Sequence, residues 1–254
     1  DSKQAGTGLG YTIGNIGLTG ADAANYVLSQ APVAGSNGVI RPAALTLGGL
    51  AAQDKVYDAS ATASVATVGQ TLLGKLGSDS VSLSAGGTLG GRFSTPNVGI
   101  SVAVTLDTTL QSSVRGIAMG SAVPVVTGVA LAGSDAGNYY VSGSSSSLSA
   151  SITRATVTIS GTKVYDGSLT FAADQLRVSG VAGESLRFDS GTATANSANV
   201  GLANTLSSLG SLNLADGQGS VVGRASNYRL SQAVMGSISI TPASLVVSAS
   251  NALK

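Results

Sequence analysis

Residues 100–107 of the chain read Ile-Ser-Val-Ala-Val-Thr-Leu-Asp, so bulky apolar side chains alternate with small or polar ones. Because successive side chains of a β-strand point to opposite faces, this stretch predicts a half-buried strand with its four bulky aliphatic residues on one face. The same alternation appears at 148–153, 156–160 and 238–241. No long segment places apolar residues at helical spacing between capping residues, so helices should be few. The chain is therefore predicted to be all-β.

The composition excludes most familiar active-site chemistry. Only 10% of the 254 residues are charged, against about 25% in an ordinary soluble domain, because Ser and Thr fill the outward strand positions. The chain has no histidine and no cysteine, which rules out Ser-His-Asp and Cys-His catalysis, zinc fingers and disulfides. Glu184 is the only glutamate, and no acidic cluster accompanies it. Lys and Arg total 13 and Asp and Glu 12, so no basic excess favours nucleic acid. We expect no enzymatic activity, no cofactor and no nucleic-acid partner.

One uncharged window is long enough to be considered as a membrane span. It covers the 19 residues 116–134, and about 20 apolar residues suffice to cross a bilayer as a helix. The window contains four glycines, a proline, a threonine and two serines, which interrupt a helix and lower its hydrophobicity. It is predicted to form strands and turns, without a membrane span.

Internal repeats organise the chain. Lys55-Val-Tyr-Asp58 returns 108 residues later as Lys163-Val-Tyr-Asp166, and Asn97-Val-Gly99 returns 102 residues later as Asn199-Val-Gly201. A third signature ends in an Asn-Tyr pair and occurs three times, at residues 18–26, 131–139 and, in a weaker form, 223–228. After each of these comes a junction of the form Ile-x-Pro/Arg-Ala, at 40–43, 152–155 and 240–243.

The order of these signatures predicts the domain organisation. Residues 1–42 form the C-terminal part of one repeat, 43–154 and 155–242 are complete repeats of 112 and 88 residues, and 243–254 hold the first strand of another. The difference in length is assigned in part to longer hairpins around residues 107–122, because loops tolerate insertions that a core does not.

These motifs resemble the YDG-type repeats, related to MBG repeats, of large bacterial filamentous-haemagglutinin-like adhesins exported by two-partner secretion. The resemblance is carried by Lys-Val-Tyr-Asp-Gly at 163–167, Asn-Val-Gly at 199–201, Gly-Ala-Asp-Ala-Ala-Asn-Tyr at 20–26 and Ile-Thr-Pro-Ala at 240–243. The chain departs from the pattern at two places. Ala59 replaces the glycine after Tyr57-Asp58, and Arg224-Ala-Ser226 replaces the Asp-Ala-Gly that leads into the Asn-Tyr pair. The resemblance implies extracellular spacer or adhesive modules, secreted to the bacterial cell surface, with no enzymatic activity.

The repeated Lys-Val-Tyr-Asp motif has two interpretations. Tyr57 with Asp58, and Tyr165 with Asp166, could stack on a sugar ring and accept its hydroxyls. Alternatively, each ring fills the core with its hydroxyl bonded to the backbone, while each Asp accepts backbone N–H groups in the next turn. Recurrence at equivalent places favours the structural interpretation. Lys55 or Lys163 could also form an intramolecular Lys-Asn crosslink with a nearby acid, which the spacing does not demonstrate.

The Asn-Tyr pairs are interpreted in structural terms. They are Asn25-Tyr26, Asn138-Tyr139 and Asn227-Tyr228. Each Asn is predicted to occupy a left-handed turn and each Tyr to anchor the next strand, as in a tyrosine corner.

Calcium is the one metal worth considering. Asp22 and Asp135 precede two of these Asn-Tyr pairs, and Ca²⁺ prefers carboxylate and carbonyl oxygens. No dense Asp-x-Asp-x-Asp-Gly loop occurs, however, and both residues can instead cap their turns. We therefore predict no metal site.

Each repeat is predicted to be a small antiparallel β-domain, an Ig-like two-sheet sandwich of roughly six to eight strands. A β-grasp-like unit or an elongated single sheet is the alternative. Opening strands follow directly on each Ile-x-Pro/Arg-Ala junction, with almost no linker, so the domains should stack into a semi-rigid rod.

Three functions fit this organisation. The first is a stalk that holds an adhesive tip away from the cell, with neighbouring repeats or copies as partners. The second is direct binding of glycan or matrix ligands by loops of the repeats. The third is self-assembly, in which residues 1–42 and 243–254 donate strands to neighbouring copies. Absence of cysteine suits a chain that crosses an outer-membrane pore unfolded.

Overall fold

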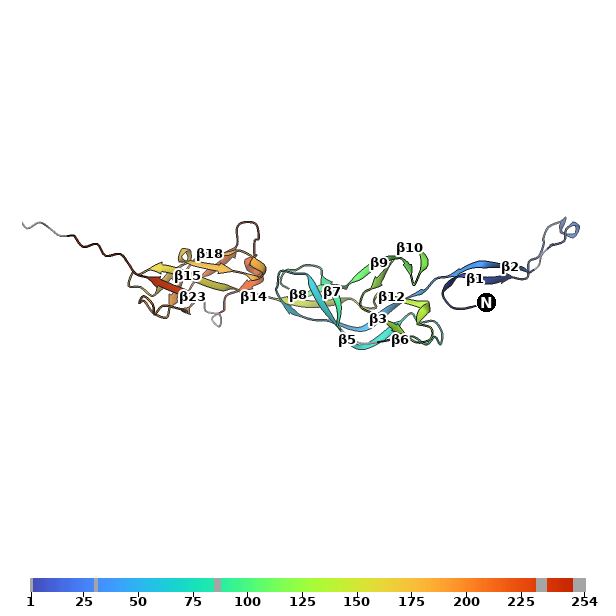
Figure 1. The fold of residues 1–254 in the computed structure, drawn as a ribbon, viewed down its shortest axis with the longest axis horizontal. Coiled ribbons are helices and arrows are strands. Elements are labelled where there is room, and N and C mark those ends of the chain that lie inside the picture. The colour runs from blue at the N-terminus through green and yellow to red at the C-terminus, as the bar shows by residue number, and fades with distance from the viewer. Residues whose placement is uncertain (1, 30–31, 85–87, 232–236, 249–254) are drawn as a thin grey trace, which may run out of the picture. The chain divides into compact units, whose positions relative to one another are not determined.

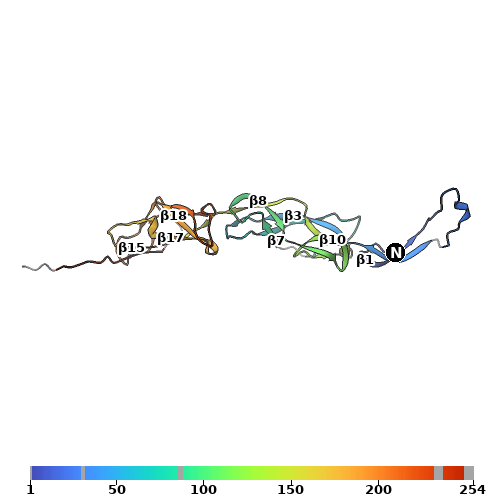
Figure 2. The same ribbon diagram turned by 90° about the horizontal axis from the view of Figure 1, so that it is seen from above.

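The computed structural model describes residues 2–29, 32–84, 88–231 and 237–248, and these ranges form an all-β fold, drawn from two sides in Figure 1 and Figure 2. The predicted fold class is confirmed. In the described ranges the only helices are 3-10 turns of three residues: η1 (Ala23–Asn25), η2 (Ala136–Asn138), η3 (Ala173–Gln175), η4 (Val181–Gly183) and η5 (Ala225–Asn227). None of these helices has the length or apolar character needed to cross a membrane.

The largest sheet has seven strands. Their order is β12 (Tyr139–Ser144), β3 (Ala43–Ala52), β5 (Thr62–Leu73), β7 (Thr88–Phe93), β8 (Gly99–Leu106), β13 (Leu148–Thr153) and β4 (Lys55–Val56). Strand β8 forms where the alternation predicted a strand, and Val104 is buried in it, but the prediction of one face for all four bulky residues is wrong at Ile100. Ile100 is 89% exposed, and the left-handed φ of 52° at Ser101 breaks the regular strand next to it. In β13, Leu148, Ala150 and Ile152 are buried, as a period of two requires.

The remaining strands form smaller sheets. Three pairs precede residue 133: β1 (Gly6–Ile13) with β2 (Val33–Ile40), β9 (Thr108–Val114) with β10 (Ile117–Val126), and β6 (Ser82–Leu83) with β11 (Leu131–Ala132). Two three-stranded sheets follow, β17 (Leu176–Ser179)-β15 (Thr158–Val164)-β23 (Ser237–Thr241) and β16 (Thr170–Ala172)-β19 (Thr192–Ala195)-β20 (Leu206–Ser208). The last pairs are β18 (Leu186–Ser190) with β21 (Asn213–Asp216) and β14 (Ala155–Thr156) with β22 (Tyr228–Arg229).

The expectation of purely antiparallel sheets is wrong. Both complete repeats pair their first strands with their last strands in parallel: β3 with β12 and β4 with β13, then β14 with β22 and β15 with β23. Parallel neighbours need a long crossover connection, and the antiparallel strands in the middle of each repeat provide it. In the second repeat the chain therefore enters at one end of the β15–β23 pair and leaves at the other.

The extra length of the first repeat lies where it was predicted. The antiparallel hairpin β9–β10 spans residues 108–126 and follows β8. In the second repeat only residues 209–212 separate β20 from β21, so no such hairpin fits there.

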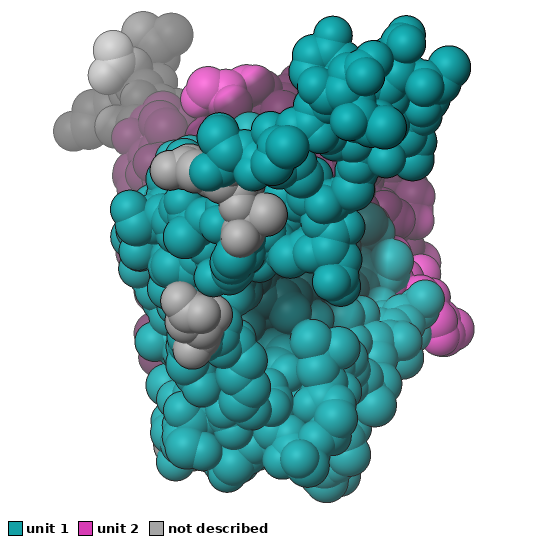
Figure 3. Space-filling model, turned by 90° about the vertical axis from the view of Figure 1, so that its right-hand side faces the viewer, with its two compact units in different colours: residues 1–53, 62–94, 103–149 teal, residues 54–61, 95–102, 150–254 magenta. Residues whose placement is uncertain are grey.

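The chain forms two compact units, coloured separately in Figure 3. Unit 1 consists of residues 1–53, 62–94 and 103–149, and unit 2 of residues 54–61, 95–102 and 150–254. The largest fully buried side chains of unit 1 are Leu45, Leu47, Val65, Phe93 and Tyr139, and those of unit 2 are Ile152, Val157, Ile159, Phe171, Leu206 and Asn227. Unit 2 thus takes in three stretches that belong to the first repeat by sequence, residues 54–61, 95–102 and 150–154.

Candidate functional site: a recurrent tyrosine and asparagine cluster

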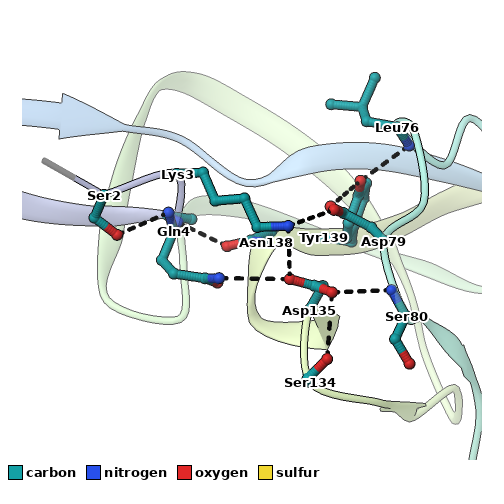
Figure 4. Close-up of polar contacts among 11 residues, drawn as sticks. Ser2, Lys3, Gln4, Leu76, Asp79, Ser80, Ser134, Asp135, Asn138 and Tyr139 are labelled. Atoms are coloured by element: carbon teal, nitrogen blue, oxygen red, sulfur yellow. Dashed lines mark hydrogen bonds and ion pairs between the residues drawn. The ribbon is translucent and has the colours of Figure 1, made fainter.

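In unit 1, the Asn-Tyr pair that ends η2 and begins β12 organises a polar cluster (Figure 4). The buried Tyr139 donates its hydroxyl proton to Asp79 Oδ2 over 2.8 Å and accepts the N–H of Leu76 over 3.0 Å. Asn138 Oδ1 accepts the N–H of Ala5 over 2.7 Å. The pair therefore fixes both a loop and the segment leading into β1.

Charged groups complete this first cluster. Lys3 Nζ lies 2.8 Å from Asp79 Oδ1 and 3.2 Å from Asp135 Oδ1. Asp135 Oδ2 accepts the N–H of Ser80 over 2.9 Å. The N–H of Ser80, followed by the Lys3 ammonium, lowers the pKa of the Asp135 carboxyl, and Lys3 lowers that of Asp79.

The two calcium candidates lie in different surroundings. Donors occupy both carboxylate oxygens of Asp135, with an ammonium among them, and Asp22 lies exposed before η1. No group of three metal-ligating side chains occurs in the described part of the chain. Both residues directly precede their 3-10 turns, as the interpretation as turn caps expected, but neither makes a side-chain hydrogen bond to its own turn.

Unit 2 repeats the arrangement with different residues. The buried Tyr228 donates to Glu184 Oε2 over 2.6 Å and accepts the N–H of Val181 over 3.0 Å. The buried Asn227 accepts the N–H of Val98 on Oδ1 and donates from Nδ2 to Asn97 Oδ1, both over 3.0 Å. In each cluster the Tyr thus joins a backbone N–H to an acid, and the Asn receives the N–H of a segment that leads into β1 or β8.

Tyr57 adds a second ring to the cluster in unit 2. Its hydroxyl donates to Glu184 Oε1 over 2.8 Å, and its ring meets that of Tyr228 edge-on with centroids 5.4 Å apart. One carboxylate therefore accepts from two phenols. Desolvation, then the hydrogen bond to Glu184, raises the pKa of Tyr57 to about 12, and the same two causes raise the pKa of Tyr228.

The family comparison agrees with these recurrent features. The YDG domain matches residues 41–116 and 149–235, which together exceed half of the chain. The chain belongs to the YDG domain family. No curated protein and no solved structure matches it. The resemblance to YDG repeats seen in the sequence is thereby confirmed, and each matched segment contains one Lys-Val-Tyr-Asp motif.

The Lys-Asp pair of this YDG motif closes a turn in both copies. Lys55 Nζ lies 2.6 Å from Asp58 Oδ1, and Lys163 Nζ lies 2.7 Å from Asp166 Oδ1. Each Asp oxygen also accepts a backbone N–H two residues on, over 2.9 Å, as the turn interpretation predicted. Ala59 adopts the left-handed backbone of its counterpart Gly167, with φ of 65° against 76°, so the departure from the YDG pattern leaves this turn conformation unchanged.

Of the two motif lysines, Lys163 is buried more deeply than Lys55. Its side chain is 1% exposed, against 17% for Lys55. The Lys163 ammonium donates to the carbonyls of Ser168 and Thr170 as well as to Asp166, and lies 5.2 Å from the Phe171 ring centroid. All three of its N–H donors are thus engaged in hydrogen bonds.

Several sequence predictions fail at individual copies. Tyr57 is buried, but its hydroxyl bonds to a carboxylate rather than to the backbone. Tyr165 is 43% exposed and Tyr26 is 70% exposed, so neither ring fills a core. Asn25, Asn138 and Asn227 do not have positive φ. Each ends a 3-10 turn instead, and in the second and third pairs the side chain serves as an acceptor.

The sequence did not predict the acids that accept from Tyr139 and Tyr228 in the two clusters. Asp79 and Glu184 lie in no repeated motif, although Glu184 stood out as the only glutamate. Asn97-Val-Gly99 was recognised as a repeat without a role. One signal could have indicated the role of these segments. Gln4-Ala-Gly6 leads into β1, and Asn97-Val-Gly99 leads into β8 in the same way, with the glycine as the first residue of each strand.

Alkaline pH should weaken unit 2 through its tyrosines. Unfolded tyrosine loses its proton near pH 10, whereas folded Tyr57 retains it until about pH 12. Its contribution to stability is complete below about pH 10 and is lost as the pH rises towards 12. Urea denaturation across this window should therefore give a shallower pH dependence for Tyr57→Phe than for the unchanged chain. Lysine titration affects both proteins alike, and equal slopes would contradict the prediction.

Proposed function

We propose that the chain is a structural repeat segment, a stalk or spacer, of a secreted bacterial cell-surface adhesin or filament. The observation that carries the proposal is the use of equivalent polar groups in both units to hold the chain's own segments. Asn138 holds Ala5 in unit 1, and Asn227 holds Val98 in unit 2. The acids beside them accept from tyrosine hydroxyls, so these groups fix structure rather than face a substrate.

The alternative of glycan binding by the repeats has less support. A groove of about 510 Å³ in unit 2 is lined by polar side chains, including Asp174, Gln175 and Arg177. Among the described residues that line it there is no aromatic ring, and a sugar-binding groove commonly offers such a ring for stacking. The exposed Tyr165 and Tyr26 do not line it.

A replacement experiment tests the spacer function. In the protein that carries this chain, residues 155–242 would be replaced by an unrelated all-β domain of similar length, and surface display and adhesion would be measured on intact cells. We expect both to be retained, whereas simple deletion of 155–242 should keep display but reduce adhesion. Loss of adhesion in the replacement, or saturable binding of the purified chain to a glycan array, would overturn the proposal.

A further inference from the structure

Two segments of unit 2, one that follows β15 and one that precedes β20, leave large side chains exposed, and we call these residues together the docking face. The docking face consists of Tyr165 and Leu169 in the first segment and Asn199, Val200 and Leu202 in the second, all of them exposed. Exposed large apolar side chains that lie close together are typical of an interaction surface.

The equivalent residues of the first repeat form a counterpart of the docking face, and the structure shows which residues bind to that counterpart. Tyr165 and Asn199-Val200 occupy the repeat positions of Tyr57 and Asn97-Val98. The local backbone is also held in the same way at both places. The N–H of Tyr57 donates to the carbonyl of Thr153, and the N–H of Tyr165 donates to the carbonyl of Thr241, each over 2.8 Å.

The asparagine turns correspond as well. Asn97 N–H donates to Thr95 Oγ1 over 3.2 Å, and Asn199 N–H donates to Ser197 Oγ over 3.1 Å. The docking face and its counterpart are thus built by the same local contacts, and the difference between them is what lies against them.

The counterpart shows what such a face binds. Tyr57 is 5% exposed because Tyr228 and Glu184 cover it, whereas Tyr165 is 43% exposed. The N–H of Val98 is bound by Asn227. The hydroxyl of Tyr165 and the N–H of Val200 are the equivalent donors on the docking face.

We propose that the docking face binds the Asn-Tyr turn of a further YDG unit. The Asn of that unit accepts the N–H of Val200, its Tyr packs edge-on against Tyr165, and its acid accepts the Tyr165 hydroxyl. The inference rests on the proposed function, since it takes the chain to be part of a tandem array.

The sequence beyond β23 supports this choice of partner. Leu245-Val-Val247 occupies the repeat position of Val157-Thr-Ile159, the opening strand of the second repeat. These three residues are assigned to no strand in the structure, and they are highly exposed. The sequence of an opening strand for a further YDG unit therefore follows the docking face directly.

A lengthened chain tests the proposal. Residues 1–242 would be followed by a second copy of residues 155–254, which joins the copies at an Ile-Thr-Pro-Ala junction like the one at 240–243. Hydrogen exchange would be measured at the Val200 amide of the first copy. Docking should slow this exchange at least about tenfold relative to the 254-residue chain, while Val98 serves as the internal example of a docked amide.

Variants in the added copy make the result specific. Asn227→Ala with Tyr228→Phe there should return the Val200 amide to fast exchange. Asn213→Ala, which alters an exposed side chain bonded to Asp189, should leave it slow. Fast exchange at Val200 in the lengthened chain, with the amides of the added β15–β23 pair protected, would overturn the proposal. That outcome would leave the spacer function intact, because flexibly joined units still separate two points.

Discussion

Replacing Glu184 by alanine is expected to lower the free energy of unfolding of unit 2 by about 3–5 kcal/mol. Its two carboxylate oxygens accept from Tyr57 over 2.8 Å and from Tyr228 over 2.6 Å. A hydrogen bond to a charged acceptor contributes about 1.5–3 kcal/mol, and a buried hydroxyl left unpaired costs about as much. The Glu184 side chain joins residues 54–61 to the rest of unit 2, so its loss should lower the stability of the whole unit.

Urea denaturation followed by circular dichroism measures this loss, and two variants control it. Glu184→Gln retains one acceptor oxygen and should lose less than Glu184→Ala. Asp174→Ala removes an exposed acid on η3 and should stay within about 0.5 kcal/mol of the unchanged chain. A loss below about 1 kcal/mol for Glu184→Ala would show that water replaces the carboxylate.

Replacing Lys163 by alanine should cost about 3 kcal/mol, the lower end of the range for breaking a buried ion pair, because the lysine is buried while its partner Asp166 is 50% exposed. Its ammonium satisfies the carbonyls of Ser168 and Thr170, and its charge lies against the Phe171 ring. The substitution leaves these carbonyls without their donor and opens a cavity beneath the ring.

The same motif provides the matched controls, measured by the same denaturation. Lys55→Ala should cost less, because the Lys55 side chain is 17% exposed and water can replace part of what it binds. Lys163→Met keeps most of the stem and should recover the packing part of the loss. Equal losses for Lys55→Ala and Lys163→Ala would contradict the view that burial sets the difference.

The strands could be predicted from sequence because their signal is local. The alternation at 100–107 and 148–153 marked β8 and β13, and the repeated motifs marked corresponding strands in both repeats. The parallel pairing of β15 with β23 could not be predicted, since alternation is the same in parallel and antiparallel strands. The acids of the site could not be predicted from sequence for a related reason. Glu184 is 127 residues from Tyr57 in the chain, and only the tertiary fold brings them together.

Tyr57 and Tyr165 show a second limit of local sequence. Both follow Lys-Val and precede Asp, and their backbones are hydrogen-bonded alike. One ring is buried and the other exposed because burial depends on what packs against the residue. A motif can therefore predict the local turn without predicting the environment of its side chain.

The parallel pairing within unit 2 has a mechanical consequence. Residues 160–164 of β15 lie in register with residues 237–241 of β23, and the chain enters one strand and leaves the other at opposite ends of the pair. Tension applied along the chain therefore pulls these two strands past each other lengthwise. Their backbone hydrogen bonds then bear the load together, in shear, instead of opening one after another from an edge.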